Sequence, residues 1–308
     1  MMTVKFSLEI PLGVVQPDEF QSLDAIADMT NALDSAGIDG AFVTDHPSPD
    51  TNWLHQGMGH DALDPFTALA CVASASRRLM LHTNIIVAGY RNPFLLAKSA
   101  ASLQKLSGGR LILGIGAGYQ KIEFDALGAD FHRRGKLFNE ALEVLGKAWA
   151  GGPVSHDGMD FTAVDVEPRP MLEKAPPIWI GGSSPAALKR AGKYGDGWCP
   201  FFAAPGMSQA NRDIAVTSID DLKERRARIE QFRQEAGRAG PFDLCSGPPV
   251  KVGFQGKGDV TKYRDAVGEM IEGGVNWISA MVPHGSRAEY IDNVQWYGEE
   301  VIAKVRGN

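Results

Sequence analysis

The segment that follows a short apolar run near residue 43 carries the densest group of side chains that could do chemistry. It reads VTDHPSPDTNWLHQGMGHD over residues 43–61 and includes Asp45, His46 and Trp53. A histidine placed by the end of a strand, beside an acidic residue, is a natural proton donor or acceptor near neutral pH. Asp45 and His46 are therefore the first candidates for acid–base catalysis.

The same segment allows a second interpretation, because histidine and aspartate are also common metal ligands. Besides the first pair it contains His55, His60 and Asp61. Later strand ends do not supply the further histidines and carboxylates of a metal-dependent barrel hydrolase, His284 being the sole candidate. We assign no metal ligand, and metal-dependent hydrolysis stays open as an alternative.

Two glycine-rich turns are candidates for holding a ligand. The first, RLILGIGAGYQ (110–120), lacks the third glycine of a dinucleotide fingerprint, because Tyr119 stands in its place. Its glycines could instead relieve crowding in the wall of a barrel. The second turn, IGGSSPAALKR (180–190), opens a helix, and backbone N–H groups at a helix start bind anions well. We expect a phosphate there, although Ser184 could simply cap the helix.

Apolar runs with strand character alternate with runs of helical periodicity along the chain. Such alternation predicts a parallel sheet, and eight units in 308 residues predict a (β/α)8 TIM barrel formed by a single domain, 1–308. Insertions in the loops are expected at 47–63, 152–176 and 202–217. The eight expected strands are 3–10, 39–46, 78–88, 110–116, 176–182, 196–201, 249–255 and 275–283.

In such a barrel the site is built where strands end, which separates candidate site residues from structural ones. His82 lies within an apolar strand and is expected to be a core residue. Glu123 and Asp125 follow the first glycine turn and are expected to be exposed residues at the start of a helix.

The charge, cysteines and hydropathy of the chain exclude several classes of protein. The net charge is −6, which gives no basic field for nucleic acid. The three cysteines are far apart in the sequence, which disfavours a disulfide framework and is typical of a reducing cytoplasm. No stretch approaches the ~20 apolar residues that a membrane span requires. We therefore expect a cytoplasmic enzyme that acts on a small molecule, without nucleic-acid or membrane partners.

Three collinear segments resemble the luciferase-like flavin and deazaflavin oxidoreductases, and within them the branch that depends on coenzyme F420. They are FVTDHPSPDTNW (42–53), the run from LHTNIIVAGYRNP to LEVLGKAW (81–149), and PPIWIGGSSPAALKRAGKYGDGWCPF (176–201). The resemblance implies a TIM barrel of the luciferase-like type, a homodimer, and a cofactor ring across the C-terminal mouth of the barrel.

The resemblance also implies roles for individual residues. Asp45 and His46 match the Asp-His pair of the F420 branch, and Asn84–Ile85 falls where the family has a non-proline cis peptide behind the ring. The implied cofactor-binding residues are Asn84, Ile85, Arg91, Gly116, Ala117, Gly118, Gly181, Gly182, Ser183 and Ser184. Trp53, Tyr119 and Phe201 are expected to line the substrate pocket.

Two departures refine these expectations. The sugar-phosphate dehydrogenases of the family have a glutamate where this chain has Tyr119, and the luciferases have Glu-His-His where it has Asp-His-Pro. The second difference favours F420 over FMN. The expected activity is hydride transfer between F420 and a small, partly apolar organic substrate, with His46 exchanging the proton. An FMN-dependent monooxygenase and a non-catalytic F420- or flavin-binding protein remain alternatives.

Overall fold

Eight parallel strands pair in sequence order and close on themselves through the contact of β1 with β11. The computed structural model describes residues 4–13, 17–55, 59–203, 214–250, 252 and 259–307. The expected TIM barrel is confirmed. The barrel strands are β1 (Lys5–Glu9), β2 (Gly40–Val43), β3 (Met80–Thr83), β5 (Leu111–Gly116), β8 (Ile178–Gly181), β9 (Gly197–Cys199), β10 (Asp243–Ser246) and β11 (Trp277–Ala280).

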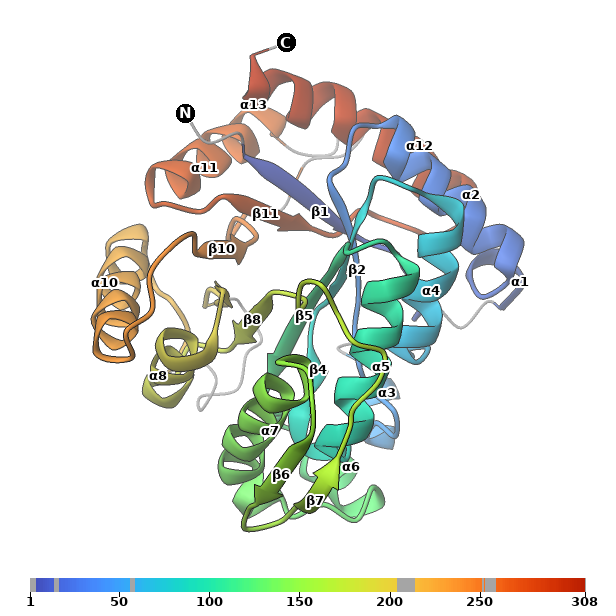
Figure 1. Cartoon of the computed structure of the whole chain (residues 1–308). Coiled ribbons are helices and arrows are strands. Elements are labelled where there is room, and N and C mark those ends of the chain that lie inside the picture. Colours follow the sequence, from blue (N-terminus) through green and yellow to red (C-terminus); the bar gives the residue numbers. More distant parts are fainter. Residues whose placement is uncertain are drawn as a thin grey trace.

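Helices surround the barrel and connect its strands (Figure 1). Several begin with the same local signal, an Asp, Asn or Ser cap followed directly by proline, as at Asp64, Asn92 and Ser184. The longer helices are α2 (Leu23–Ser35), α4 (Pro65–Ala75), α5 (Pro93–Leu106), α7 (Arg134–Trp149), α8 (Pro185–Tyr194), α10 (Ile219–Glu235), α11 (Val260–Glu272) and α12 (Arg287–Tyr297). The shorter ones are α1 (Pro17–Phe20), α3 (Thr51–His55), α6 (Lys121–Ala126), α13 (Lys304–Arg306), the 3₁₀ turns η1 (Ala88–Tyr90) and η2 (Phe131–Arg133), and the π-helical η3 (Gly298–Ala303).

Buried side chains form one large core between strands and helices and a smaller one inside the barrel. The inner core contains Ile112, Trp179 and Trp277, and the two indole rings meet edge to face at 5.3 Å. His82 contacts Trp179 in the same interior. Burial lowers the pKa of His82 to about 3, so the ring is neutral, and neither nitrogen has a hydrogen-bond partner among the described residues. His82 is thus a core residue, as predicted.

Two predicted strands differ in the structure. The run 78–88 is divided into β3 and β4 (Ile86–Val87) by a cis peptide bond between Asn84 and Ile85. The predicted strand 249–255 is wrong for residues 249, 250 and 252, which are not in a strand, and the rest of that run lies outside the described residues. The seventh barrel strand is β10, a short run that hydropathy did not distinguish from a loop.

The stretch 152–176, expected to be irregular, contains an antiparallel hairpin of β6 (Val154–Asp157) and β7 (Thr162–Val166). It lies beside α7, on the side of the molecule away from the chain ends (Figure 1). Glu140 of α7 accepts hydrogen bonds from the Asp160 and Phe161 amides and fixes the hairpin there. Across the described ranges, no helix is both long and apolar enough to span a membrane.

Candidate active site

The predicted site residues come from the C-terminal ends of neighbouring strands. Asp45 and His46 follow β2, the Asn84–Ile85 bond follows β3, and the glycine turns follow β5 and β8. Because all barrel strands are parallel, these ends meet at one mouth.

The imidazole of His46 is held by Glu123, a residue of α6. Nδ1 of His46 lies 3.2 Å from Oε2 of Glu123, and the Gln120 amide nitrogen is 3.3 Å from the same ring atom. An ionised carboxylate only accepts hydrogen bonds, so we assign the proton to Nδ1. The Gln120 amide nitrogen, itself a donor, then makes no hydrogen bond to Nδ1. Nε2 has no hydrogen-bond partner in the described part of the chain and is left to exchange a proton with a ligand.

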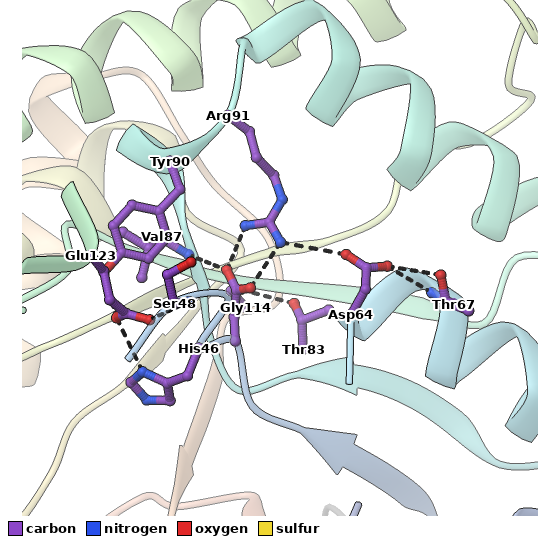
Figure 2. A network of polar contacts seen from close by, with 11 residues as sticks. His46, Ser48, Asp64, Thr67, Thr83, Val87, Tyr90, Arg91, Gly114 and Glu123 are labelled. Carbon is purple, nitrogen blue, oxygen red and sulfur yellow. Dashed lines mark hydrogen bonds and ion pairs between the residues drawn. The ribbon is translucent and has the colours of Figure 1, made fainter. Parts of the chain in front are cut away.

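Glu123 is fully buried and surrounded by donors. Besides His46, it accepts hydrogen bonds from the Tyr90 hydroxyl at 2.8 Å and the Ser48 amide at 3.3 Å. Burial alone would raise the pKa of Glu123, but the bonds from His46 and Tyr90 outweigh it and hold that pKa below its usual value. Glu123 is therefore ionised at neutral pH and can stabilise an imidazolium at His46. Figure 2 shows Glu123 directed toward the His46 ring.

Asp45, in contrast, does not contact the His46 ring. Its carboxylate binds both terminal nitrogens of Arg91, at 2.6 and 2.8 Å, and accepts the Val87 amide at 3.0 Å. Arg91 also reaches Asp64 at 3.5 Å, as Figure 2 shows. Asp45 was expected to act with His46 in acid–base catalysis, but the carboxylate that contacts the ring is that of Glu123. Arg91, expected to bind the cofactor, is engaged by Asp45.

The cis peptide after β3 explains two of the glycines. A Cβ on Gly116 or Gly181 would collide with the side chain of Ile85, so both positions leave room for this bulge in the barrel mouth. Gly118 has φ +78°, and a side chain there would also strike Val87 and Phe124. Ala117, between Gly116 and Gly118, is half-buried against the core.

The second turn offers donors for an anion. The Ser184 hydroxyl accepts the Ala187 amide at 3.3 Å, and the buried Ser183 hydroxyl accepts the Phe201 amide at 3.3 Å. Both hydroxyls keep their hydrogen, which has no acceptor among the residues described here. Together with Gly182 at φ +100° and the start of α8, they fit a phosphate group.

Aromatic rings surround His46. Trp53 lies 4.5 Å from it between ring centroids, Tyr119 6.0 Å and His60 5.1 Å. Burial lowers the pKa of His60, which favours its neutral form. Phe201 follows β9 and contacts the Ser183 turn, so it belongs to the same mouth but has no ring contact with His46 among the described contacts. Trp53 and Tyr119 thus lie beside His46, and their role in lining a substrate pocket stays a prediction.

The sequence did not predict Glu123 or Tyr90 as site residues, and His60 was considered only as a possible metal ligand. Glu123 was expected to be exposed, yet it is buried, while the preceding Ile122 is 52% exposed. This burial is the opposite of what the hydropathy of the two residues predicts, so a hydropathy pattern could not identify Glu123 as a buried residue. No local signal in the sequence places Glu123 beside the His46 ring, because the two residues are 77 positions apart.

The alternative of a metal-dependent hydrolase is not supported by the side chains that the structure describes. Among them, no three His, Cys, Asp or Glu residues are grouped so that they could hold one metal ion. His60 turns its Nδ1 to the Asp61 carbonyl at 3.0 Å.

Comparisons with known proteins agree with this architecture. The family model described as luciferase-like monooxygenase matches residues 5–256. An F420-dependent glucose-6-phosphate dehydrogenase from Beutenbergia cavernae is 31% identical over 328 aligned positions, which cover 94% of this chain and 95% of that protein.

Solved structures share the fold at lower identity. An F420-dependent secondary alcohol dehydrogenase in complex with an F420-acetone adduct superposes with a TM-score of 0.75 at 18% identity, over 98% of this chain and 99% of that one. The oxygenating constituent of 3,6-diketocamphane monooxygenase from Pseudomonas putida, in complex with FMN, has a TM-score of 0.69 at 17% identity, over 98% and 99% of the chains. The chain therefore belongs to the luciferase-like monooxygenase family of oxidoreductases and resembles the F420-dependent dehydrogenases within it.

Proposed function

We propose that the protein is an F420-dependent oxidoreductase that transfers a hydride between the cofactor and a small, partly apolar alcohol, carbonyl or activated alkene. The observation that carries the proposal is the His46 imidazole, held through Nδ1 by a buried carboxylate with Nε2 left free. When bound, F420 supplies the carbon that accepts or donates the hydride, and the protein supplies position and protons.

The residues of the mouth fit this cofactor. Ile85 forms the surface on which the ring would rest, and Gly182, Ser183 and Ser184 would hold its phosphate. Asp45 and Arg91 would act by fixing β4 and the bulge that precedes it.

In the oxidation of an alcohol, the substrate carbon loses a hydride and its hydroxyl loses a proton. Nε2 of His46 is the acceptor for that proton, and the resulting imidazolium is stabilised by the Glu123 carboxylate. In the reverse direction the imidazolium returns the proton to the carbonyl oxygen. Trp53 and Tyr119 supply apolar surface beside the ring.

Cofactor identity is tested by titrating the purified protein with F420 and with FMN while following the fluorescence of each. We expect tight F420 binding. Tight FMN binding without a response to F420 would overturn the choice of cofactor and favour the monooxygenase alternative.

Catalysis is tested with three probes on the F420-loaded protein: propan-2-ol, glucose 6-phosphate and, with reduced F420, cyclohex-2-en-1-one. Replacing His46 with alanine should lower the rate of hydride transfer about 10²- to 10⁴-fold with little change in F420 affinity. A wild-type rate in His46→Ala would refute the role of His46. F420 binding without turnover of any probe would favour a non-catalytic binding protein.

A further inference from the structure

A third carboxylate, Glu9, lies at the same end of the barrel as His46. In β1, Phe6 packs outward on Tyr297 of α12, whereas Lys5 lies over the Trp277 ring of the inner core. Ser7 is also on the inner side, since its hydroxyl and Trp277 both approach Gly40. Because side chains alternate along a strand, Glu9 shares the inward face with Lys5 and Ser7.

Glu9 is the last residue of β1, and its neighbour across the ladder is Phe42. Phe42 comes three residues before Asp45 on β2, the strand whose end positions His46. The carboxyl group of Glu9 is thus placed in the upper layer of the barrel interior, below the mouth. The residue is half-buried and therefore not sealed within the core.

The carboxylate of Glu9 has no hydrogen bond or ion pair with any described residue. Within the described ranges, the titratable side chain that contacts Glu9 is Tyr290 of α12, whose hydroxyl donates to the backbone oxygen of Glu9 and not to its carboxylate. Burial raises the pKa of Glu9 to about 7, with no compensating partner. A carboxyl group in this state can be a hydrogen-bond donor at neutral pH.

Glu9 differs from the other carboxylates of the mouth in that no described cation neutralises it. Asp45 is neutralised by Arg91 and Glu123 faces His46, so the cations of this region that the structure describes are already engaged. An anionic substrate group near Glu9 would meet no unpaired cation among the residues described for this mouth, and would be repelled once Glu9 ionised.

We infer that Glu9 is a specificity-determining residue, a protonated carboxyl that donates a hydrogen bond to an uncharged hydroxyl or carbonyl oxygen of the substrate and disfavours phosphorylated and carboxylated substrates. This inference rests on the proposed function and names its substrate class. It separates this chain from the glucose-6-phosphate dehydrogenases that it resembles in sequence.

The protonation state is tested without any substrate, by infrared difference spectroscopy of the F420-loaded protein between pH 6 and pH 8.5. The wild type should lose a protonated-carboxyl band as the pH rises, and Glu9→Gln should lack that band. The exposed Glu299 serves as the control position, and Glu299→Gln should keep the band. A band that persists in Glu9→Gln would overturn the inference.

Specificity is tested by comparing kcat/KM for propan-2-ol and glucose 6-phosphate. The wild type should prefer propan-2-ol, and Glu9→Leu should lower kcat/KM for propan-2-ol about tenfold or more, since a buried hydrogen bond to substrate is lost. The wild-type rate should decline above pH 7, because ionised Glu9 can no longer donate a hydrogen bond. Glu9→Gln, which keeps the shape and a donor, should remove that decline.

Equal or better use of glucose 6-phosphate by the wild type, or full activity of Glu9→Leu, would overturn the inference. If F420 binds but neither compound is turned over, the substrate assignment fails together with the catalytic proposal. The infrared result would still show whether Glu9 is protonated, so the two failures are distinguishable.

Discussion

Asp45 and Glu123 are two buried carboxylates of the candidate site, and they differ in what neutralises them. Asp45 is bound by Arg91, whose guanidinium stays charged at any physiological pH, and by a backbone amide of β4. Glu123 is bound by His46, whose charge can change, and by the neutral donors Tyr90 and Ser48. A carboxylate with a permanent cation fixes structure, whereas one facing a titratable ring can take part in proton transfer.

The structural role of Asp45 can be tested with Asp45→Ala, which leaves Arg91 without its main partner. We expect a loss of about 3 kcal/mol in the free energy of unfolding, because one half of a largely buried ion pair is removed. Chemical denaturation measures this loss. Asp125→Ala is the matched control, since it removes an exposed i,i+4 pair with Lys121 worth only about 0.3–0.5 kcal/mol. Equal losses in both variants would contradict a structural role for Asp45.

The proposed role of Glu123 in proton transfer can be tested with Glu123→Gln. This variant keeps the shape of the side chain but removes the charge that stabilises an imidazolium at His46. We expect hydride transfer to fall about 100-fold, within the range of acid–base effects, while F420 affinity changes little. Asp125→Asn, an exposed acid on the same helix, should retain the wild-type rate. Single-turnover kinetics with the probe that the wild type uses provide the measurement, and an unchanged rate in Glu123→Gln would exclude the role of Glu123.

Glu9 differs from both Asp45 and Glu123, because its carboxylate pairs with no cation among the described residues. Its pKa of about 7 lies above the ordinary value of 4.5, so the folded state holds this proton more tightly than the unfolded state. The contribution of Glu9 to the free energy of unfolding is therefore fully present below about pH 4.5. It is lost as the pH rises through 7, by at most about 3 kcal/mol. Thermal unfolding at pH 5 and pH 8 should show this loss in the wild type and not in Glu9→Gln. A similar pH dependence in both proteins would contradict the shift.

Much of the fold followed from sequence because alternating β and α periodicity is a long-range pattern. The barrel and most strand positions belong to this class, and the cap at Ser184 was also expected from its local sequence. Strand β10 was missed because a four-residue run carries too little pattern, and the β6–β7 hairpin because its strands are mostly exposed. The expected homodimer stays a prediction.

The site was predictable only in part. Strand ends located Asp45, His46 and the Asn84–Ile85 bond, and the resemblance supplied their expected roles. The sequence could not show which carboxylate meets the His46 ring. Adjacency along the chain favoured Asp45, but the side chain of Asp45 reaches Arg91, and Glu123 reaches the ring from 77 residues away. Such partners depend on tertiary packing, which no local pattern encodes.

The central claim, that Glu123 acts through His46, is tested most directly by a double-mutant cycle on the rate of hydride transfer. The four proteins are the wild type, His46→Ala, Glu123→Gln and the double variant. We expect Glu123→Gln to lower the rate of hydride transfer about 100-fold when His46 is present, and less than about twofold once His46 is replaced by alanine. An equal loss in both backgrounds would show that Glu123 acts independently of His46 and would contradict the account.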